Sequence, residues 1–484
     1  MPLLRNTVVY VAVGFLPVAA NLLLAPVYTS FLEPEEYALI GLATLFQTFL
    51  TFFLSFSLDS AFSRIYFDYE KKGRAKYDVL GSLMVAVTVI SLVALVILWF
   101  SGNAIFSLIF TNPEFTFTNY GSWVLLSTYS NIIYLFFAVY YRNEEKPKFF
   151  ILLSTLFFII PVAGTLAGLI IFKQGAYGAI AGRAIGSIVF IGLLLIGFML
   201  KQRPELKSSY LITALKFSLP LVPFQIMFAA FSNVDRFVLE RYFTAFDFGV
   251  YNFAVMVTGV IPVFLNAVGN ATNPRIFRIL GSESNTAPVK RINNVILLAS
   301  TFVICACVAV VVPAMRLIIN PSYKDSYVYI GTLFISFLPY LHYLVYNIPL
   351  FYFGKTKVFP LISFFALVSG IGANILLVPY IGLWSVCISL YVIRGIQALA
   401  AYMFVRQYQY HRSDYIKQKK PWVCTGALII VYNLFLFLNI KFQFLPIDIV
   451  NLVPLVVLLS TMTIFYRKEL LLIINEVRKM RSSF

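Results

Sequence analysis

Charged residues are scarce in this chain, and their scarcity decides its class. Only 12% of the 484 residues are Asp, Glu, Lys or Arg, while 60% are hydrophobic and the mean hydropathy is +0.87. An average soluble domain carries about 25% charged residues. Apolar runs of about 20 residues recur along the sequence, and each is long enough to cross about 30 Å of hydrocarbon as a helix. The composition therefore excludes a soluble protein and predicts an all-α polytopic membrane protein.

Residues that build catalytic and metal sites are also few. The four cysteines all lie in apolar runs, where a buried thiol behaves as a small hydrophobic group. The two histidines, His342 and His411, lack the acidic or cysteine neighbours that a metal or nucleophile site needs. The sequence contains no GxxxxGK[ST] loop, which would hold the phosphates of ATP. We therefore expect no catalytic residues, no metal, no cofactor and no enzymatic activity.

Breaks at charged, Gly/Pro-rich or Asn-rich stretches divide the chain into about fourteen transmembrane helices. The expected spans are 6–31, 37–63, 79–110, 119–141, 149–172, 177–200, 209–242, 248–273, 292–319, 327–353, 359–379, 383–405, 421–440 and 449–466. An even number of spans places both termini on the same side of the membrane.

The basic residues indicate which side that is. About 28 of the 37 Lys and Arg lie at the two termini or in the even-numbered loops, counting the loop between the first two spans as the first. The odd-numbered loops, on the opposite side, hold only Lys173, Arg241, Lys324 and Lys441. Because cytoplasmic loops carry the excess of Lys and Arg, both termini are predicted to be cytoplasmic. The net charge of +17 is spread over short loops and not gathered in a polar module, so nucleic acid is not expected as a partner.

An internal repeat with an offset of 211 residues relates the two halves of the chain. Arg64 corresponds to Arg275 at the inner end of the second span of each half, and Arg183 corresponds to Arg394 in the sixth. Six spans separate equivalent points, so the two copies enter the membrane from the same side. Parallel repeats of this kind are typical of transporters that work by alternating access. The expected domains are a six-helix bundle at 1–205, a second at 206–410, and two further helices with a basic amphipathic cytoplasmic tail at 411–484.

Charged residues inside the spans are the candidate functional residues, because a charge at the bilayer centre costs about 2.5 to 3.5 kcal/mol on insertion scales. Arg394 and Arg183 lie well inside their helices, and Asp235 and Arg236 are adjacent in the seventh span. Cations outnumber carboxylates among these residues, which suits an anionic substrate such as a phosphate or pyrophosphate. The predicted substrate-binding residues are Arg236, Arg394 and Arg183, and the predicted gating or ion-pair residues are Asp235, Asp59, Lys216, Arg64 and Arg275. For Asp235 and Arg236 an ion pair that only holds helices together is an open alternative.

Several short motifs resemble the polysaccharide (O-antigen type) flippases of the multidrug/oligosaccharidyl-lipid/polysaccharide exporter superfamily. They are Arg5-Asn6-Thr7, Leu32-Glu33-Pro34-Glu35-Glu36-Tyr37, Leu219-Pro220-Leu221, Asp235-Arg236-Phe237-Val238-Leu239 and Phe248-Gly249-Val250-Tyr251. The resemblance covers about residues 1–405. It implies two six-helix bundles that face each other in a V around a central cationic cavity.

The same resemblance implies a substrate and a location. The substrate would be oligosaccharide linked to undecaprenyl pyrophosphate, flipped from the inner to the outer leaflet of a bacterial cytoplasmic membrane. Membrane lipids, and the polysaccharide polymerase or glycosyltransferases of the same pathway, would be its partners. Two alternatives stay open. One is a drug or cation antiporter of the same superfamily, and the other is a flippase for a lipid II-type peptidoglycan precursor, which the fourteen expected spans favour.

Overall fold

The computed structural model describes residues 22–70, 75–201, 207–282, 287–355, 357–408, 419–442 and 446–465. Throughout these residues the secondary structure is helical and no strand is present, which confirms the predicted all-α class. Arg5, most of the first expected span and the basic tail lie outside the described residues. The chain divides into two compact units, Met1–Phe253 and Ala254–Phe484.

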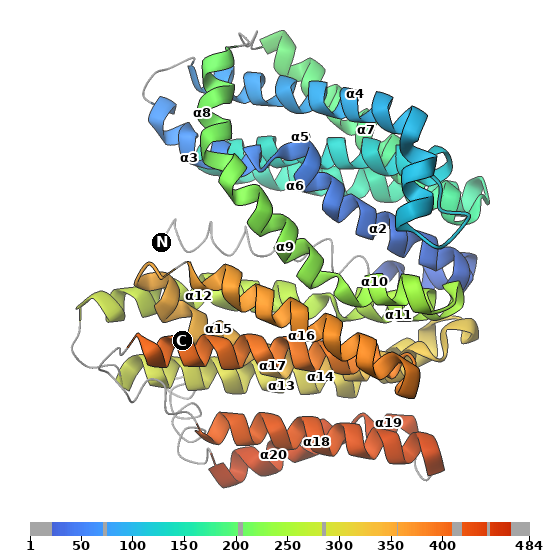
Figure 1. Cartoon of the computed structure of the whole chain (residues 1–484), viewed down its shortest axis with the longest axis vertical. Coiled ribbons are helices and arrows are strands. Elements are labelled where there is room, and N and C mark those ends of the chain that lie inside the picture. Colours follow the sequence, from blue (N-terminus) through green and yellow to red (C-terminus); the bar gives the residue numbers. More distant parts are fainter. Residues whose placement is uncertain are drawn as a thin grey trace, which may run out of the picture. The chain divides into compact units, whose positions relative to one another are not determined.

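The first unit begins, among the described residues, with the short apolar helix Leu22–Phe31 (Figure 1). The elements that follow are α2 (Pro34–Ser55), α3 (Leu58–Glu70), α4 (Ala75–Ile109), η1 (Phe117–Gly121), α5 (Ser122–Asn143), α6 (Pro147–Leu166), η2 (Ala167–Ile171), α7 (Gly175–Lys201), α8 (Ser208–Ser218), η3 (Leu219–Leu221), α9 (Val222–Ser232) and α10 (Val234–Tyr242). Helix α11 (Ala245–Thr258) begins in the first unit and ends in the second.

The second unit contains the rest of the chain. Its elements are α12 (Val260–Ser282), α13 (Ala287–Ile318), η4 (Pro321–Tyr323), α14 (Ser326–Ile335), α15 (Phe337–Tyr352), α16 (Val358–Ile381), α17 (Trp384–Gln407), α18 (Lys419–Phe442), α19 (Ile447–Val450) and α20 (Val453–Phe465). Helices α15 and α16 both pack on α17, and α18 packs along α20.

Eleven helices within the described residues are long and apolar enough to cross a membrane. A bent pair, Ser208–Leu221 with Gln225–Ser232, makes a twelfth candidate, and the shorter apolar helices Leu22–Phe31 and Ile447–Ser460 lie where the first and last spans are expected. A multi-pass membrane protein is therefore confirmed, whereas the count of fourteen stays a prediction.

The outward faces of these helices are apolar. On α4, for example, Val96, Trp99 and Phe100 are more than half exposed. Such faces would be a liability in water, but hydrocarbon solvates them without penalty. Hydroxyl groups inside the helices bond to the carbonyl one turn earlier, as Thr128 does to Val124 at 2.6 Å, so that these polar groups stay satisfied without water.

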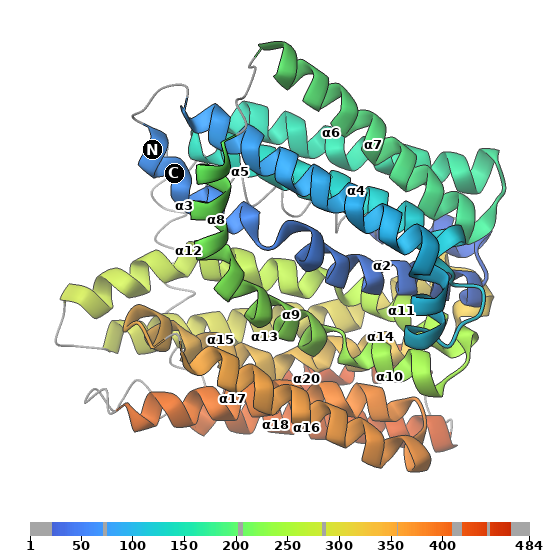
Figure 2. The same cartoon turned by 45° about the horizontal axis from the view of Figure 1, so that its top comes forward.

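The contact between α6 and α7 depends on glycine (Figure 2). A Cβ atom on Gly182 would lie 2.1 Å from the carbonyl oxygen of Gly164, and one on Gly168 would lie 1.9 Å from that of Gly178. The two backbones therefore touch directly, which is the close approach that small residues permit between membrane helices. This contact fixes the rotation of α7, and with it the direction of the neighbouring Arg183.

Candidate functional site

Arg236 lies near the start of α10, just after a break in the seventh expected span. The break is at Asn233, whose buried side chain donates from Nδ2 to the carbonyl oxygen of Ala229 at 2.9 Å. Its Oδ1 accepts a hydrogen bond from Nη1 of Arg236 at 3.1 Å. Asn233 thus joins α9 to α10 and holds the Arg236 guanidinium in place.

Asp235 points to a different partner. Its side chain is buried, and its Oδ2 accepts a hydrogen bond from the hydroxyl of Tyr251 on α11 at 2.9 Å. The other oxygen, Oδ1, has no hydrogen-bond partner among the described residues. A buried carboxylate with only one donor is unusual, because an unsatisfied lone pair loses its hydration without compensation. Asp235 therefore links α10 to α11 through Tyr251.

Two neighbouring tyrosines are each within electrostatic range of one of the predicted binding cations. Tyr28 precedes α2 and Tyr37 lies in its first turn, and their ring centroids are 6.3 Å apart. Arg236 is within electrostatic range of the Tyr37 phenol, and Arg183 of α7 is within range of the Tyr28 phenol. The fold thus brings these arginines, which are 53 positions apart in the sequence, within electrostatic range of the two members of one tyrosine pair.

Arg394, the third predicted binding residue, lies on α17 in the second unit. Its Nη1 donates a short hydrogen bond to Oγ of Ser336, the buried residue between α14 and α15. Its guanidinium carbon lies 3.6 Å from the centroid of the Phe337 ring, which is a close cation–π contact. One turn earlier, the Tyr391 hydroxyl donates to the carbonyl oxygen of Thr332 at 3.0 Å. Part of the Arg394 charge is therefore balanced within its own unit.

The remaining predicted residues occupy varied positions. Arg64 of α3 lies over the Phe217 ring of α8, 4.7 Å from its centroid. Lys216 on α8 and Arg275 on α12 are exposed. Asp59 lies in the first turn of α3 and is half-buried, and its Oδ2 is 3.5 Å from the hydroxyl of Ser60. Within the first unit, Asp59 and Arg64 therefore have separate partners.

One carboxylate that the sequence analysis did not single out has a structural role near the end of α10. Glu240 is buried, and its Oε1 accepts hydrogen bonds from the backbone N–H and the hydroxyl of Thr111, the latter at 2.8 Å. The Thr111 hydroxyl also lies 2.6 Å from the Glu240 carbonyl oxygen. The sequence did not single out Glu240 because it lies near the end of an expected span, where a charged side chain is normally explained by exposure to water.

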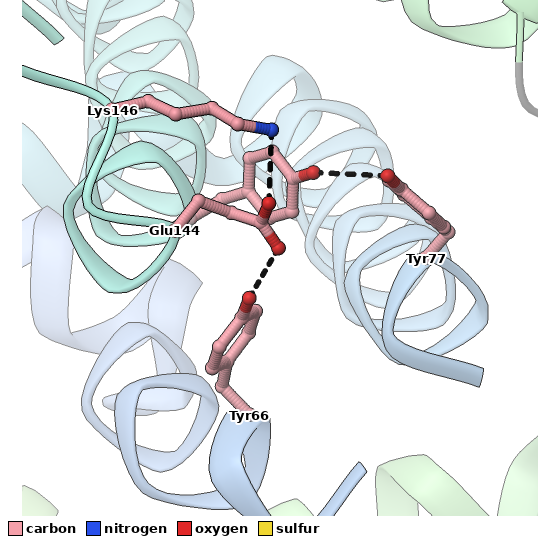
Figure 3. Close-up of polar contacts among 5 residues, drawn as sticks. Tyr66, Tyr77, Glu144 and Lys146 are labelled. Atoms are coloured by element: carbon pink, nitrogen blue, oxygen red, sulfur yellow. Dashed lines mark hydrogen bonds and ion pairs between the residues drawn. The ribbon is translucent and has the colours of Figure 1, made fainter. Parts of the chain in front are cut away.

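A second group lies around the turn between α5 and α6 (Figure 3). Glu144 accepts hydrogen bonds from the Tyr66 hydroxyl of α3 and from Lys146 Nζ at 2.9 Å, while the Tyr140 hydroxyl of α5 donates to that of Tyr77 on α4 at 3.1 Å. The contact with Glu144 raises the pKa of Lys146. The group fastens α3, α4 and α5 to one another.

The apolar spans, with charged residues inside several of them, define a multi-pass membrane protein. Residues 3–280, more than half of the sequence, match the family described as polysaccharide biosynthesis protein, and the chain belongs to that family. No curated protein matches the sequence.

Solved structures show the same fold at low sequence identity. An inward-facing multidrug resistance MATE family transporter of the MOP superfamily has a TM-score of 0.67 and 14% identity, covering 85% of this chain and 99% of that one. The lipid II flippase MurJ, in an inward closed conformation, also gives 0.67, with 17% identity over 96% of this chain and 99% of that one. A MATE protein in the straight conformation gives 0.58, with 15% identity over 86% of this chain and 97% of that one.

Proposed function

We propose that this protein is a flippase that moves undecaprenyl-pyrophosphate-linked oligosaccharide, the repeat unit of a polysaccharide, from the inner to the outer leaflet by alternating access. The family supports the pathway, and the fold is shared with transporters and a flippase. The observation that carries the proposal is the guanidinium of Arg236, which lies inside an expected span and is oriented by its hydrogen bond to Asn233.

The chemistry of that placement suits a diphosphate. The N–H donors of a guanidinium lie in one plane, with a spacing that suits hydrogen bonds to two oxygens of a phosphate. The bond to Asn233 takes one donor of Arg236 and orients the group, so that its other donors can contact a ligand. A cationic drug, by contrast, would be repelled by the arginines, which argues against the antiporter alternative.

The alternative of a lipid II-type precursor rests on one observation. The MurJ structure covers 96% of this chain, whereas the MATE structures reported above cover 85% and 86%. The larger coverage indicates that the last helices, α18 to α20, also have counterparts in the lipid II flippase. Both lipids carry the same pyrophosphate, so the two cargoes differ only in the sugar or peptide that follows it.

The proposed location is the bacterial cytoplasmic membrane, with both termini in the cytoplasm. The bias of Lys and Arg toward one set of loops supports this orientation. Membrane lipids surround the protein, and the enzymes that build and polymerise the repeat unit are its proposed pathway partners. Thiol labelling of single cysteines introduced into opposite loops of intact cells tests the orientation.

The test of function is translocation in proteoliposomes that contain fluorescent undecaprenyl-pyrophosphate oligosaccharide. We expect Arg236→Ala and Arg183→Ala to lower the flipping rate by about tenfold or more, since a charge-assisted hydrogen bond contributes about 1.5 to 3 kcal/mol. The matched control is Arg241→Ala, which removes an exposed cation from the same helix as Arg236 and should change little. Flipping at the native rate by all three variants would refute the cationic site. Transport of lipid II alone would select the alternative cargo.

A further inference from the structure

Two helices of the first unit are broken, and the break between α2 and α3 is unusual in its backbone. Phe56 and Ser57 connect these helices, and both have positive φ angles, 45° and 58°. Residues other than glycine rarely adopt this left-handed conformation, and two in succession persist only where the surrounding structure holds them. The helix is therefore interrupted at one defined place, between α2 and α3.

The second break lies in the helix formed by α8, η3 and α9. Pro220 and Pro223 lack the N–H that an α-helix requires, and their rings crowd the preceding turn. The segments on either side, Ser208–Leu221 and Gln225–Ser232, are bent by 44°. Proline therefore bends this helix, whereas left-handed residues bend the other.

The two breaks meet. The Ser57 hydroxyl donates a hydrogen bond of 2.6 Å to Oε1 of Gln225, across 168 positions in the sequence. On one side of this bond α2 packs on α9, and on the other side α3 packs on α8 (Figures 1 and 2). The interruptions of the two helices thus lie next to each other in the unit.

The segments on each side of the breaks are fastened to each other. Besides the contact of Arg64 with Phe217, Lys207 at the start of α8 lies 3.7 Å from Asp78 on α4, and its backbone N–H donates to Ser82 Oγ at 3.1 Å. On the other side, the rings of Phe49 on α2 and Phe237 on α10 meet edge to face at 5.4 Å.

We propose that the two breaks form a single joint, about which α3 and α8 turn as one body relative to α2 and α9. The bond between Ser57 and Gln225 keeps the two bends in step. We call α3, α8 and the start of α4 the inner body. The side chains of Arg64, Asp78 and Lys207 hold it together while it moves. The proposal does not depend on which molecule is transported, because it concerns only how bending of one helix is transmitted to the other.

The test measures distances between spin labels in the full-length protein in lipid nanodiscs, without any transport substrate. One label pair, Thr44→Cys with Ser63→Cys, spans the joint from α2 to α3. The other pair, Ser63→Cys with Thr213→Cys, lies within the inner body on α3 and α8. Each pair is placed in a chain whose native cysteines are replaced, with and without Pro220→Ala and Pro223→Ala. These two changes restore N–H donors and favour a straighter α8–α9 helix. Pro220→Ala alone serves if the double change does not fold.

Straightening α8–α9 is expected to shift the distance across the joint by several ångström and to leave the distance within the inner body unchanged. Adding Ser57→Ala to the proline changes should instead alter the distance between α3 and α8 and leave the distance between α2 and α3 unchanged. The reason is that α8 would then move without α3. The proposal is wrong if the proline changes alter the distance between α3 and α8 while α2 to α3 stays fixed. It is also wrong if neither distance changes. Because no lipid-linked substrate is present, a failure here is distinct from a failure of the proposed transport function.

Discussion

The direct contact between α6 and α7 makes a quantitative prediction about Gly182. In Gly182→Ala the new Cβ would lie 2.1 Å from the carbonyl oxygen of Gly164, whereas carbon and oxygen normally approach no closer than about 3.3 Å. The two helices must therefore separate by about 1 Å, and overpacking of this kind costs about 1 to 3 kcal/mol.

Alanine also stabilises a helix relative to glycine, and this gain must be separated from the clash. Gly192 lies on the same helix, and a Cβ atom there would have nothing within 4 Å, so Gly192→Ala supplies the gain of up to about 1 kcal/mol without the clash. The difference in stability between the two variants then reports the packing contact alone. We expect Gly182→Ala to be the less stable by about 1 to 3 kcal/mol, which corresponds to a shift on the order of 1 °C in Tm for each kcal/mol.

The assay is heating of detergent-purified protein, followed by size-exclusion chromatography of the fraction that stays monodisperse. Flipping by Gly182→Ala should also fall, because Arg183 is the next residue and moves with α7. If Gly182→Ala melts at the same temperature as Gly192→Ala, the backbones of α6 and α7 do not touch, and the explanation for the direction of Arg183 fails with it.

Three further predictions concern polar contacts. Tyr251→Phe removes the donor to Asp235 and should destabilise the protein by about 1 to 3 kcal/mol. In a double variant, Asp235→Asn should rescue part of the loss, because it removes the carboxyl group that has lost its donor; no rescue would show that this bond is not the cause. Glu240→Gln should lower the melting temperature by a few degrees through its weaker bonds to the loop after α4, and an unchanged temperature would show that this loop is not held there. Arg316 and Asp448 form an exposed ion pair at 2.8 Å, which should contribute at most about 1 kcal/mol to stability in a double-mutant cycle and nothing at high salt. A larger coupling energy that does not depend on salt would contradict this prediction.

The sequence by itself determined the class and the elements of this protein. Runs of about 20 apolar residues can only be membrane helices, because hydrocarbon leaves no other way to satisfy the backbone hydrogen bonds. Pro220 and Pro223 bend their helix for an equally local reason, since proline lacks the N–H that the helix needs. Short motifs predicted the family, which the match over residues 3–280 confirms.

Only the tertiary structure decided which residues lie together. Tyr28 and Tyr37 have no local feature that assigns them to Arg183 and Arg236, since phenols are common throughout the sequence. The left-handed backbone at Ser57 was equally hidden, because it is held by a bond to Gln225, far away in the chain. Hydropathy depends on each residue and its near neighbours, whereas a site depends on how helices rotate and where they touch, and packing contacts between distant segments set both.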